Sequence, residues 1–130
     1  MRLVSIVDDD ESLRRSIRNF LTSVGFQVET FASAEAFLQS AHRDDTGCVM
    51  LDLRMPGMSG LDLLRRLAAT DSPIPVIILT AHSADETRRQ ALQAGAVAFL
   101  GKPFHGEALL DVVRKALRKP GRIPDTLSSP

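Results

Sequence analysis

The sequence contains a single cysteine, Cys48, among its 130 residues. One cysteine cannot form a disulfide within the chain, which suits a reducing compartment. Sixteen basic and sixteen acidic residues cancel, so no domain-wide charge favours nucleic acid or an anionic membrane as a partner. No apolar stretch approaches the length of a membrane span, and the N-terminus lacks the apolar segment of a signal peptide. The composition therefore predicts a cytoplasmic protein that binds neither membranes nor nucleic acid directly.

Two familiar kinds of binding motif are also missing. The sequence has neither a glycine-rich phosphate loop nor cysteine and histidine residues at zinc-binding spacing. We therefore assign His42 and His105 to surface loops, and we expect Cys48 to be a buried thiol because it lies in an apolar run. The length and the 44% hydrophobic content suit one domain over residues 1–118. Residues 119–130 are rich in proline, glycine and serine, which predicts a flexible tail or linker.

Strand-like and helix-like segments alternate five times along the chain. Apolar runs predict strands at about residues 3–7, 26–31, 48–52, 76–79 and 97–100. Apolar residues at helical spacing, with capping and stop signals, predict helices at about residues 10–24, 34–41, 60–68, 84–94 and 106–118. This alternation is typical of a doubly wound α/β fold, in which helices cover both faces of a parallel sheet.

The last two predicted helices differ in their apolar content. The helix at residues 84–94 has mostly alanine at its apolar positions, with Leu92 as its only large aliphatic residue, so we expect it to be loosely anchored. The helix at residues 106–118 has more apolar residues than one narrow stripe needs. Part of its surface is therefore a candidate for contact with a partner.

Four of the predicted strands end in residues that carry chemistry. Asp8 and Asp9 follow the first strand, Asp52 ends the third, Thr80 ends the fourth, and Lys102 follows the fifth. A lone carboxylate at the end of a buried strand costs free energy unless an interaction uses it. The strand ends therefore offer acids, a hydroxyl and an amine to a functional site.

These residues occur in short motifs, in an order and spacing that resemble the receiver domain of bacterial two-component response regulators. The motifs are Val7-Asp8-Asp9, Asp52 with Met55-Pro56-Gly57-Met58-Ser59-Gly60, Thr80-Ala81, and Lys102-Pro103-Phe104. The resemblance extends from about residue 3 to residue 117. The phrase Leu51-Asp52-Leu53-Arg54-Met55-Pro56 further resembles receivers that precede LuxR-type helix-turn-helix output domains. The resemblance implies a flavodoxin-like (βα)5 fold with strand order 2-1-3-4-5 and a ligand site at the carboxyl ends of the central strands.

In this strand order, Asp8, Asp9 and Asp52 converge. Two carboxylates about 5 Å apart repel by roughly 3 kcal/mol at an effective dielectric constant near 20, so three clustered acids need a counter-ion. An open acidic site suits Mg²⁺, which keeps several of its water ligands. The resemblance implies that Asp52 accepts a phosphoryl group from a sensor histidine kinase. It also implies that Asp9, Asp52 and the Arg54 carbonyl ligate the metal directly, while Asp8 acts mainly through water.

The resemblance also assigns roles to residues around the acids. Lys102 would offset the charge of the phosphoryl oxygens, and the family holds the peptide bond between Lys102 and Pro103 in the cis form. The Thr80 hydroxyl would bond a phosphoryl oxygen, and Thr80 with Phe99 would form the conformational switch. Arg54 and His82 lie two residues beyond Asp52 and Thr80, where receivers tune water access to the acyl phosphate.

The implied partners follow from the same resemblance. Besides the kinase, phosphorylation would promote a homodimer through the fourth helix, the fifth strand and the fifth helix. A DNA-binding output domain, absent from this chain, would follow the tail, or the chain would act as a stand-alone receiver. Such a domain is not an enzyme in the ordinary sense, because it catalyses only its own phosphorylation and dephosphorylation.

Other interpretations are possible for several residues. Asp10 and Glu11 are better explained as acids that favour the N-terminus of the following helix. Arg54 and His82 are equally explained as exposed loop residues, and a packed strand residue is the alternative interpretation of Phe99. A haloacid dehalogenase-type phosphatase needs a second aspartate two residues after its nucleophile, where this chain has Arg54. A phosphorylation-independent interaction module would predict loss of some of the four key residues, and the sequence retains all of them: Asp9, Asp52, Thr80 and Lys102.

Overall fold

The computed structural model contains one five-stranded parallel sheet with strand order β2-β1-β3-β4-β5. It describes residues 3–53, 60–69, 74–80, 85–102 and 104–118. The strands are β1 (Leu3–Val7), β2 (Gln27–Phe31), β3 (Thr46–Asp52), β4 (Val76–Thr80) and β5 (Ala98–Gly101). The helices are α1 (Glu11–Ser23), α2 (Ala34–Leu38), α3 (Gly60–Ala68), α4 (Asp85–Gln93) and α5 (Gly106–Arg118), with a short 3-10 helix, η1 (Arg43–Asp45). The predicted doubly wound fold and its strand order are confirmed.

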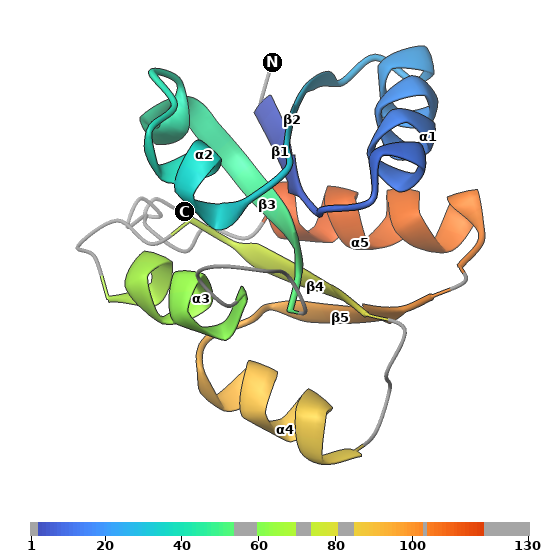
Figure 1. Ribbon diagram of the computed structural model, residues 1–130. Coiled ribbons are helices and arrows are strands. Elements are labelled where there is room, and N and C mark those ends of the chain that lie inside the picture. The colour runs from blue at the N-terminus through green and yellow to red at the C-terminus, as the bar shows by residue number, and fades with distance from the viewer. Residues whose placement is uncertain (1–2, 54–59, 70–73, 81–84, 103, 119–130) are drawn as a thin grey trace, which may run out of the picture.

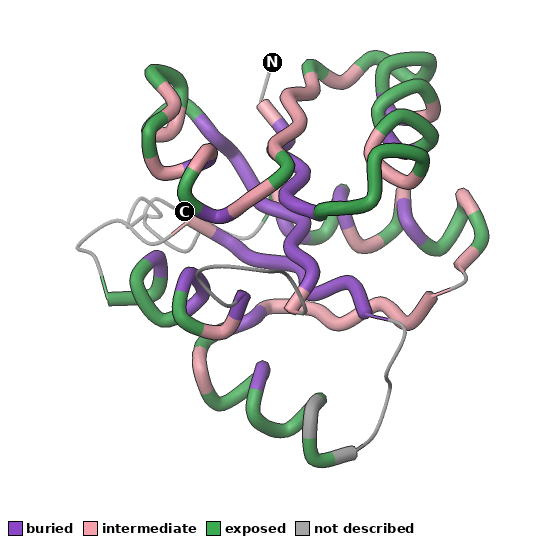
Figure 2. The backbone as a smooth tube through the Cα atoms, viewed as in Figure 1, coloured by how far each residue is buried: buried purple, intermediate pink, exposed green. Residues whose placement is uncertain are grey.

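The sheet separates two apolar clusters, because successive side chains of a strand point to opposite faces. On β3, Cys48 and Met50 pack with α1 and α5, whereas Val49 and Leu51 pack with α2, α3 and α4. Figure 1 shows these two sets of helices on either side of the sheet. The buried residues concentrate in the central strands, while the outer surfaces of the helices are exposed (Figure 2). Cys48 is fully buried, as predicted.

The predicted ends of the first helix agree closely with α1. The Asp10 side chain caps the helix by accepting a hydrogen bond from the Leu13 amide at 3.2 Å. Gly25 follows the C-terminal end with a φ of 104°, a conformation that glycine adopts without the strain of a side chain. The Asp10 contact agrees with the interpretation that this acid favours the N-terminus of the first helix.

The second predicted helix is wrong at its C-terminal end, because α2 stops at Leu38 and excludes Ala41. The Ser33 side chain caps α2 by accepting a hydrogen bond from the Ala36 amide. Beyond Leu38, the Ser40 hydroxyl accepts a hydrogen bond from the His42 amide, which offers the backbone an alternative to the helix. The segment between α2 and β3 contains η1, and β3 begins at Thr46 rather than at the predicted Cys48.

The remaining helices differ in how firmly they pack. In α3, Leu63 is buried alongside Leu64 and Leu67, although the sequence pattern did not single it out, and Ala68 is exposed. In α4, Ala91 is buried, whereas Leu92 is 45% exposed, which agrees with the predicted thin anchorage. The broad apolar surface of α5 packs largely against the sheet, both through its buried residues and through three partly buried ones: Leu110, Val112 and Leu117.

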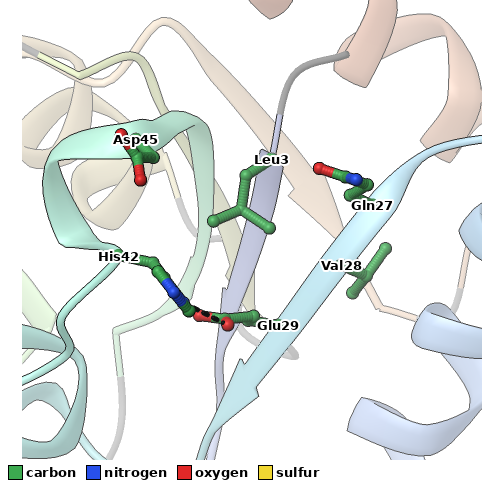
Figure 3. A pocket seen from close by; sticks show the side chains of 6 residues that line it. All are labelled: Leu3, Gln27, Val28, Glu29, His42 and Asp45. Carbon is green, nitrogen blue, oxygen red and sulfur yellow. Dashed lines mark hydrogen bonds and ion pairs between the residues drawn. The ribbon is translucent and has the colours of Figure 1, made fainter.

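The amino ends of the strands carry a separate cavity of about 520 Å³. His42 is exposed there, as predicted, but its Nδ1 atom lies 2.7 Å from Oε2 of Glu29 on β2. Figure 3 shows these two side chains directed toward each other, with Leu3 and Asp45 among the other residues that line the cavity. This cavity lies at the opposite end of the sheet from the acidic residues that follow β1 and β3. Among the described residues, no helix is long and apolar enough to cross a membrane.

Candidate functional site

Three carboxylates meet at the carboxyl ends of β1 and β3. These strands are parallel neighbours with Val7 opposite Leu51, so the residues that follow in each, Asp8 and Asp52, lie side by side. Asp8 is fully buried, Asp52 is 6% exposed, and Asp9 is exposed. One carboxylate oxygen from each of the three lies within 4.8 Å of the others. The structure thus brings together the acids that the sequence analysis grouped.

Lys102 reaches this cluster from the end of β5. Its Nζ atom donates a hydrogen bond to Oδ2 of Asp8 at 3.0 Å and lies 3.4 Å from Oδ2 of Asp52. The other oxygen of Asp8, Oδ1, accepts a hydrogen bond from the Asp10 amide at 2.8 Å. Asp8 is therefore held on both sides, which accounts for how a fully buried carboxylate is tolerated.

The surroundings of Lys102 change its pKa in two opposing directions. Burial of the ammonium group lowers the pKa, but the hydrogen bond and negative charge of Asp8, followed by those of Asp52, outweigh burial and raise it above its ordinary value. Lys102 is therefore protonated at neutral pH. It places one fixed positive charge between two carboxylates.

Thr80 lies at the same edge of the sheet. It ends β4 opposite Gly101 of β5, and it is 1% exposed. Its backbone carbonyl accepts a hydrogen bond from the Lys102 amide at 2.8 Å. The backbones of Thr80 and Lys102 are therefore tied together beside the acids.

The first residue of α3 also shapes the site. A Cβ atom at Gly60 would overlap the backbone carbonyl of Asp52 and lie 2.6 Å from the Cα atom of Leu53. The Gly60 amide donates a hydrogen bond to the Leu53 carbonyl at 3.3 Å. Glycine thus allows α3 to begin against the end of β3. In the sequence, Gly60 is recognisable only as the last residue of the motif that begins at Met55.

The three acids fit a hard divalent cation. Carboxylate oxygens are the ligands that Mg²⁺ prefers, and Mg²⁺ needs only one or two of them because it retains water. Asp9 is exposed, so the cluster is open to solvent on one side. Asp8, whose two oxygens already accept hydrogen bonds, is less available as a direct ligand than Asp9 or Asp52.

Phe99 lies on β5 opposite Ile78, two residues before Thr80 along β4. It is partly buried and packs against the cluster on the α4 side of the sheet. The guanidinium of Arg88 on α4 lies 5.7 Å from the centre of the Phe99 ring, within the range of a cation–π interaction. This contact between α4 and β5 was not predicted from the sequence.

Sequence reasoning also missed Arg14 and an apolar cavity near Lys102. Arg14 on α1 donates a hydrogen bond from Nη1 to the Asp8 carbonyl at 2.7 Å. The cavity, of about 570 Å³, lies between α1 and α5, and Phe20 and Phe104 contribute to its lining together with Lys102. The only sequence signal for Arg14 is its position four residues after Asp10, the cap of α1.

Several predicted residues lie outside the described part of the chain. They are Arg54 with its carbonyl, the 55–59 segment, Ala81, His82, Pro103 and the 119–130 tail. Their predicted roles in metal binding, hydrolysis, the cis peptide bond and linkage remain predictions.

Comparison with known proteins places this chain in a family. The profile of the response regulator receiver domain matches residues 4–114. Nodulation protein W of Bradyrhizobium diazoefficiens is 44% identical over 90% of this chain and 52% of its own length. Transcriptional regulatory protein FixJ of the same organism is 40% identical over 89% of this chain and 57% of its own length. The chain thus spans about half the length of these curated relatives.

A solved structure agrees with these matches. The response regulator receiver protein from Burkholderia phymatum is 42% identical, with a TM-score of 0.79, and the alignment covers 90% of this chain and 95% of that one. The fold, the strand order and the acidic cluster at the carboxyl ends of β1 and β3 are those expected from the resemblance found in the sequence. The chain therefore belongs to the response regulator receiver domain family.

Proposed function

We propose that this domain accepts a phosphoryl group from a sensor histidine kinase onto Asp52 and changes its surface in response. The observation that carries the proposal is the position of Asp52, nearly buried at the end of β3, next to the Lys102 ammonium and within the acidic cluster. Receiver domains are signalling domains of two-component systems, and they bind Mg²⁺ at an acidic pocket. For this chain, the nucleophile, the metal and the kinase belong to the proposal.

In the proposed transfer, a carboxylate oxygen of Asp52 forms a bond to phosphorus while the bond from phosphorus to the imidazole nitrogen of the donor breaks. The imidazole leaves with the electron pair, and Asp52 becomes an acyl phosphate. Lys102 already lies 3.4 Å from Oδ2 of Asp52, so its ammonium is placed to offset charge on the phosphoryl oxygens. When bound by Asp9 and Asp52, Mg²⁺ would supply further charge compensation at the same oxygens.

Phosphoryl uptake is the direct test of this function. Incubation with acetyl phosphate and Mg²⁺ should add one phosphoryl group per chain, seen as a shifted band in a phosphate-affinity gel and as a single mass increase. A chain that stays unmodified, under conditions that phosphorylate a receiver of established function, would contradict the proposal.

The metal part of the proposal predicts a specific role for Asp9. Replacing Asp9 by alanine should weaken Mg²⁺ binding by roughly tenfold or more, because one negative charge and one ligand are lost from the cluster. Metal-dependent phosphorylation should fall in parallel. Asp10→Asn is the matched control, because it removes the neighbouring charge while keeping a side-chain oxygen that can cap α1. Calorimetry that gives the same Mg²⁺ affinity for Asp9→Ala and wild type would argue against Asp9 as a ligand.

The switch is proposed to act through Thr80, Phe99 and α4. The Thr80 hydroxyl would move toward a phosphoryl oxygen, Phe99 would turn into the space that Thr80 leaves, and α4 would shift. The thin packing of α4, where Ala91 is buried and Leu92 is exposed, favours such a shift. The phosphoryl group biases this equilibrium only through bonds that differ between the two states, chiefly those from Thr80 and Lys102.

This switch predicts that Thr80→Ala separates phosphoryl-group binding from the response. Beryllofluoride with Mg²⁺, which stands in for the phosphoryl group, should perturb the amide signals of α4 and β5 in the wild-type protein and increase its self-association in sedimentation. In Thr80→Ala, beryllofluoride should still bind, but these distant changes should be lost. Thr80→Ser keeps the hydroxyl and should respond like wild type. Unchanged α4 and β5 signals in activated wild-type protein would overturn the switch, whereas a monomer with shifted signals would overturn only the dimer.

The wider role follows from the relatives. FixJ is named a transcriptional regulatory protein, and this chain covers only about half of its length. We infer that the receiver controls transcription through an output domain outside this chain, of the LuxR type that the phrase around Asp52 resembles. The proposed compartment is the cytoplasm, where a kinase domain and DNA are both accessible.

A further inference from the structure

Asp9 differs from the other two acids in how it is held. Asp8 is buried and bonded to Lys102, and Asp52 is nearly buried at the end of β3. Asp9 is exposed, and among the described residues its carboxylate has no hydrogen-bond partner. The backbone on either side of Asp9 therefore sets the direction of its Cα–Cβ bond, from which the carboxylate extends. The peptide group between Asp8 and Asp9 is the link from the fixed acid to the exposed one.

Arg14 binds this peptide group directly. Its Nη1 atom donates a 2.7 Å hydrogen bond to the Asp8 carbonyl, in a partly buried position. The Asp8 amide is already bonded to the Phe31 carbonyl of β2, and the Asp10 amide to Asp8 Oδ1. These two bonds hold the turn on either side of the peptide group, but neither involves its carbonyl. Arg14 thus supplies the described bond that opposes rotation of the peptide plane between Asp8 and Asp9.

We propose that Arg14 is a positioning residue of the acidic cluster, which fixes the peptide plane before Asp9 and thereby aims the Asp9 carboxylate at Asp52. The inference rests on the proposed Mg²⁺ site. Hydrogen-bond partners that orient metal ligands typically change metal affinity by about 10- to 100-fold when they are removed. Arg14 acts through the backbone of the ligand rather than on the cation, and its own charge repels the cation.

Because Arg14 is positively charged, the direction in which its removal changes the Mg²⁺ affinity tests the proposal. If Arg14 only added positive charge near the acids, its removal would strengthen Mg²⁺ binding. If Arg14 positions Asp9, its removal weakens binding despite the lost repulsion. Arg14→Met keeps much of the apolar stem but removes both the charge and the donor. Arg14→Lys keeps the charge and offers an ammonium donor to the carbonyl.

The matched control is Arg15→Met, because Arg15 is the next residue of α1, is exposed, and pairs with Glu11. Amide signals followed by NMR during a titration with MgCl₂ give the affinity at Asp8, Asp9 and Asp10 and show at the same time whether each variant is folded. We expect Arg14→Met to bind Mg²⁺ about tenfold more weakly than wild type. Arg14→Lys should recover part of this loss, and Arg15→Met should bind as tightly as wild type or slightly more tightly.

The outcomes separate this inference from the proposed function. If the wild-type amides respond to MgCl₂ and folded Arg14→Met binds with equal or higher affinity, the positioning role is overturned while the metal site stands. If Arg14→Lys binds as weakly as Arg14→Met, the hydrogen bond to the Asp8 carbonyl is not the cause, and the inference is also overturned. If the wild-type amides do not respond at all, the proposed metal site itself is overturned.

Discussion

Replacing Asp52 by asparagine is expected to abolish phosphoryl uptake from acetyl phosphate. Asparagine has nearly the same shape as aspartate, so the end of β3 and its contact with Gly60 should be preserved. The amide lacks the negative charge and the nucleophilic oxygen pair of the carboxylate, and it cannot form the same acyl phosphate. Mass measurement after incubation with acetyl phosphate and Mg²⁺ should therefore show one added phosphoryl group on wild type and none on Asp52→Asn.

The control for this experiment is Asp111→Asn on α5. Asp111 is also an aspartate, but it is exposed and pairs with Lys115 on the surface of the helix. This variant should accept the phosphoryl group as wild type does. Labelling of Asp52→Asn at the wild-type level would assign the modification to another residue and remove the central step of the proposed function.

The acids of the site were predictable because they sit where apolar runs stop. The runs before Asp8 and Asp52 identify two strands, and parallel pairing then places the two ends at one edge of the sheet. Lys102 and Thr80 follow the same logic on β5 and β4. What the sequence does not contain is the direction of each side chain. The apolar run before them does not distinguish Asp8, which is buried and bonded to Lys102, from Asp9, which is exposed, and only the family resemblance gave them different roles.

The contacts that were not predicted depend on side-chain conformations and on how the helices pack. Arg14 and Arg15 are adjacent arginines on α1, and only the way α1 packs determines that Arg14 turns toward Asp8 while Arg15 pairs with Glu11. Arg88 reaches Phe99 from α4 in the same way. Local hydrogen bonds also changed the boundaries of elements. The Ser40 side chain bonds to the backbone beyond Leu38, where the apolar spacing alone predicted more helix.

The second large effect is expected from Lys102→Met, which removes the cation between Asp8 and Asp52. Methionine fills a similar volume, so the main loss is electrostatic. Asp8 is fully buried, and removing one partner of a buried pair costs about 3 to 5 kcal/mol, or about 2 kcal/mol here because Lys102 is 21% exposed. Urea unfolding in EDTA should show this loss of stability. Phosphoryl uptake should also slow by about 100-fold, since a cation beside the transferred oxygens is lost.

The pH dependence of this loss follows from the raised pKa of Lys102. Because the pKa of Lys102 is raised in the folded protein, its interactions with Asp8 and Asp52 stabilise the fold in full at any pH below 10.5, the ordinary pKa of lysine. The stabilisation is lost only as the pH rises through the higher folded value. The difference in unfolding free energy between Lys102→Met and wild type should therefore be the same at pH 7 and at pH 9.

Magnesium distinguishes this electrostatic role from simple packing. A divalent cation between the carboxylates takes over the charge compensation that the ammonium supplied, and it no longer meets the repulsion of that ammonium. Mg²⁺ should therefore bind Lys102→Met about tenfold more tightly than wild type and restore most of the lost stability. Lys115→Met removes an exposed lysine that pairs with Asp111, and it should change stability by less than about 0.5 kcal/mol with or without the metal. If Lys102→Met were destabilised equally in EDTA and in Mg²⁺, the ammonium would be a packing element of the strand end, and the three acids would not form the cation site that the proposed function requires.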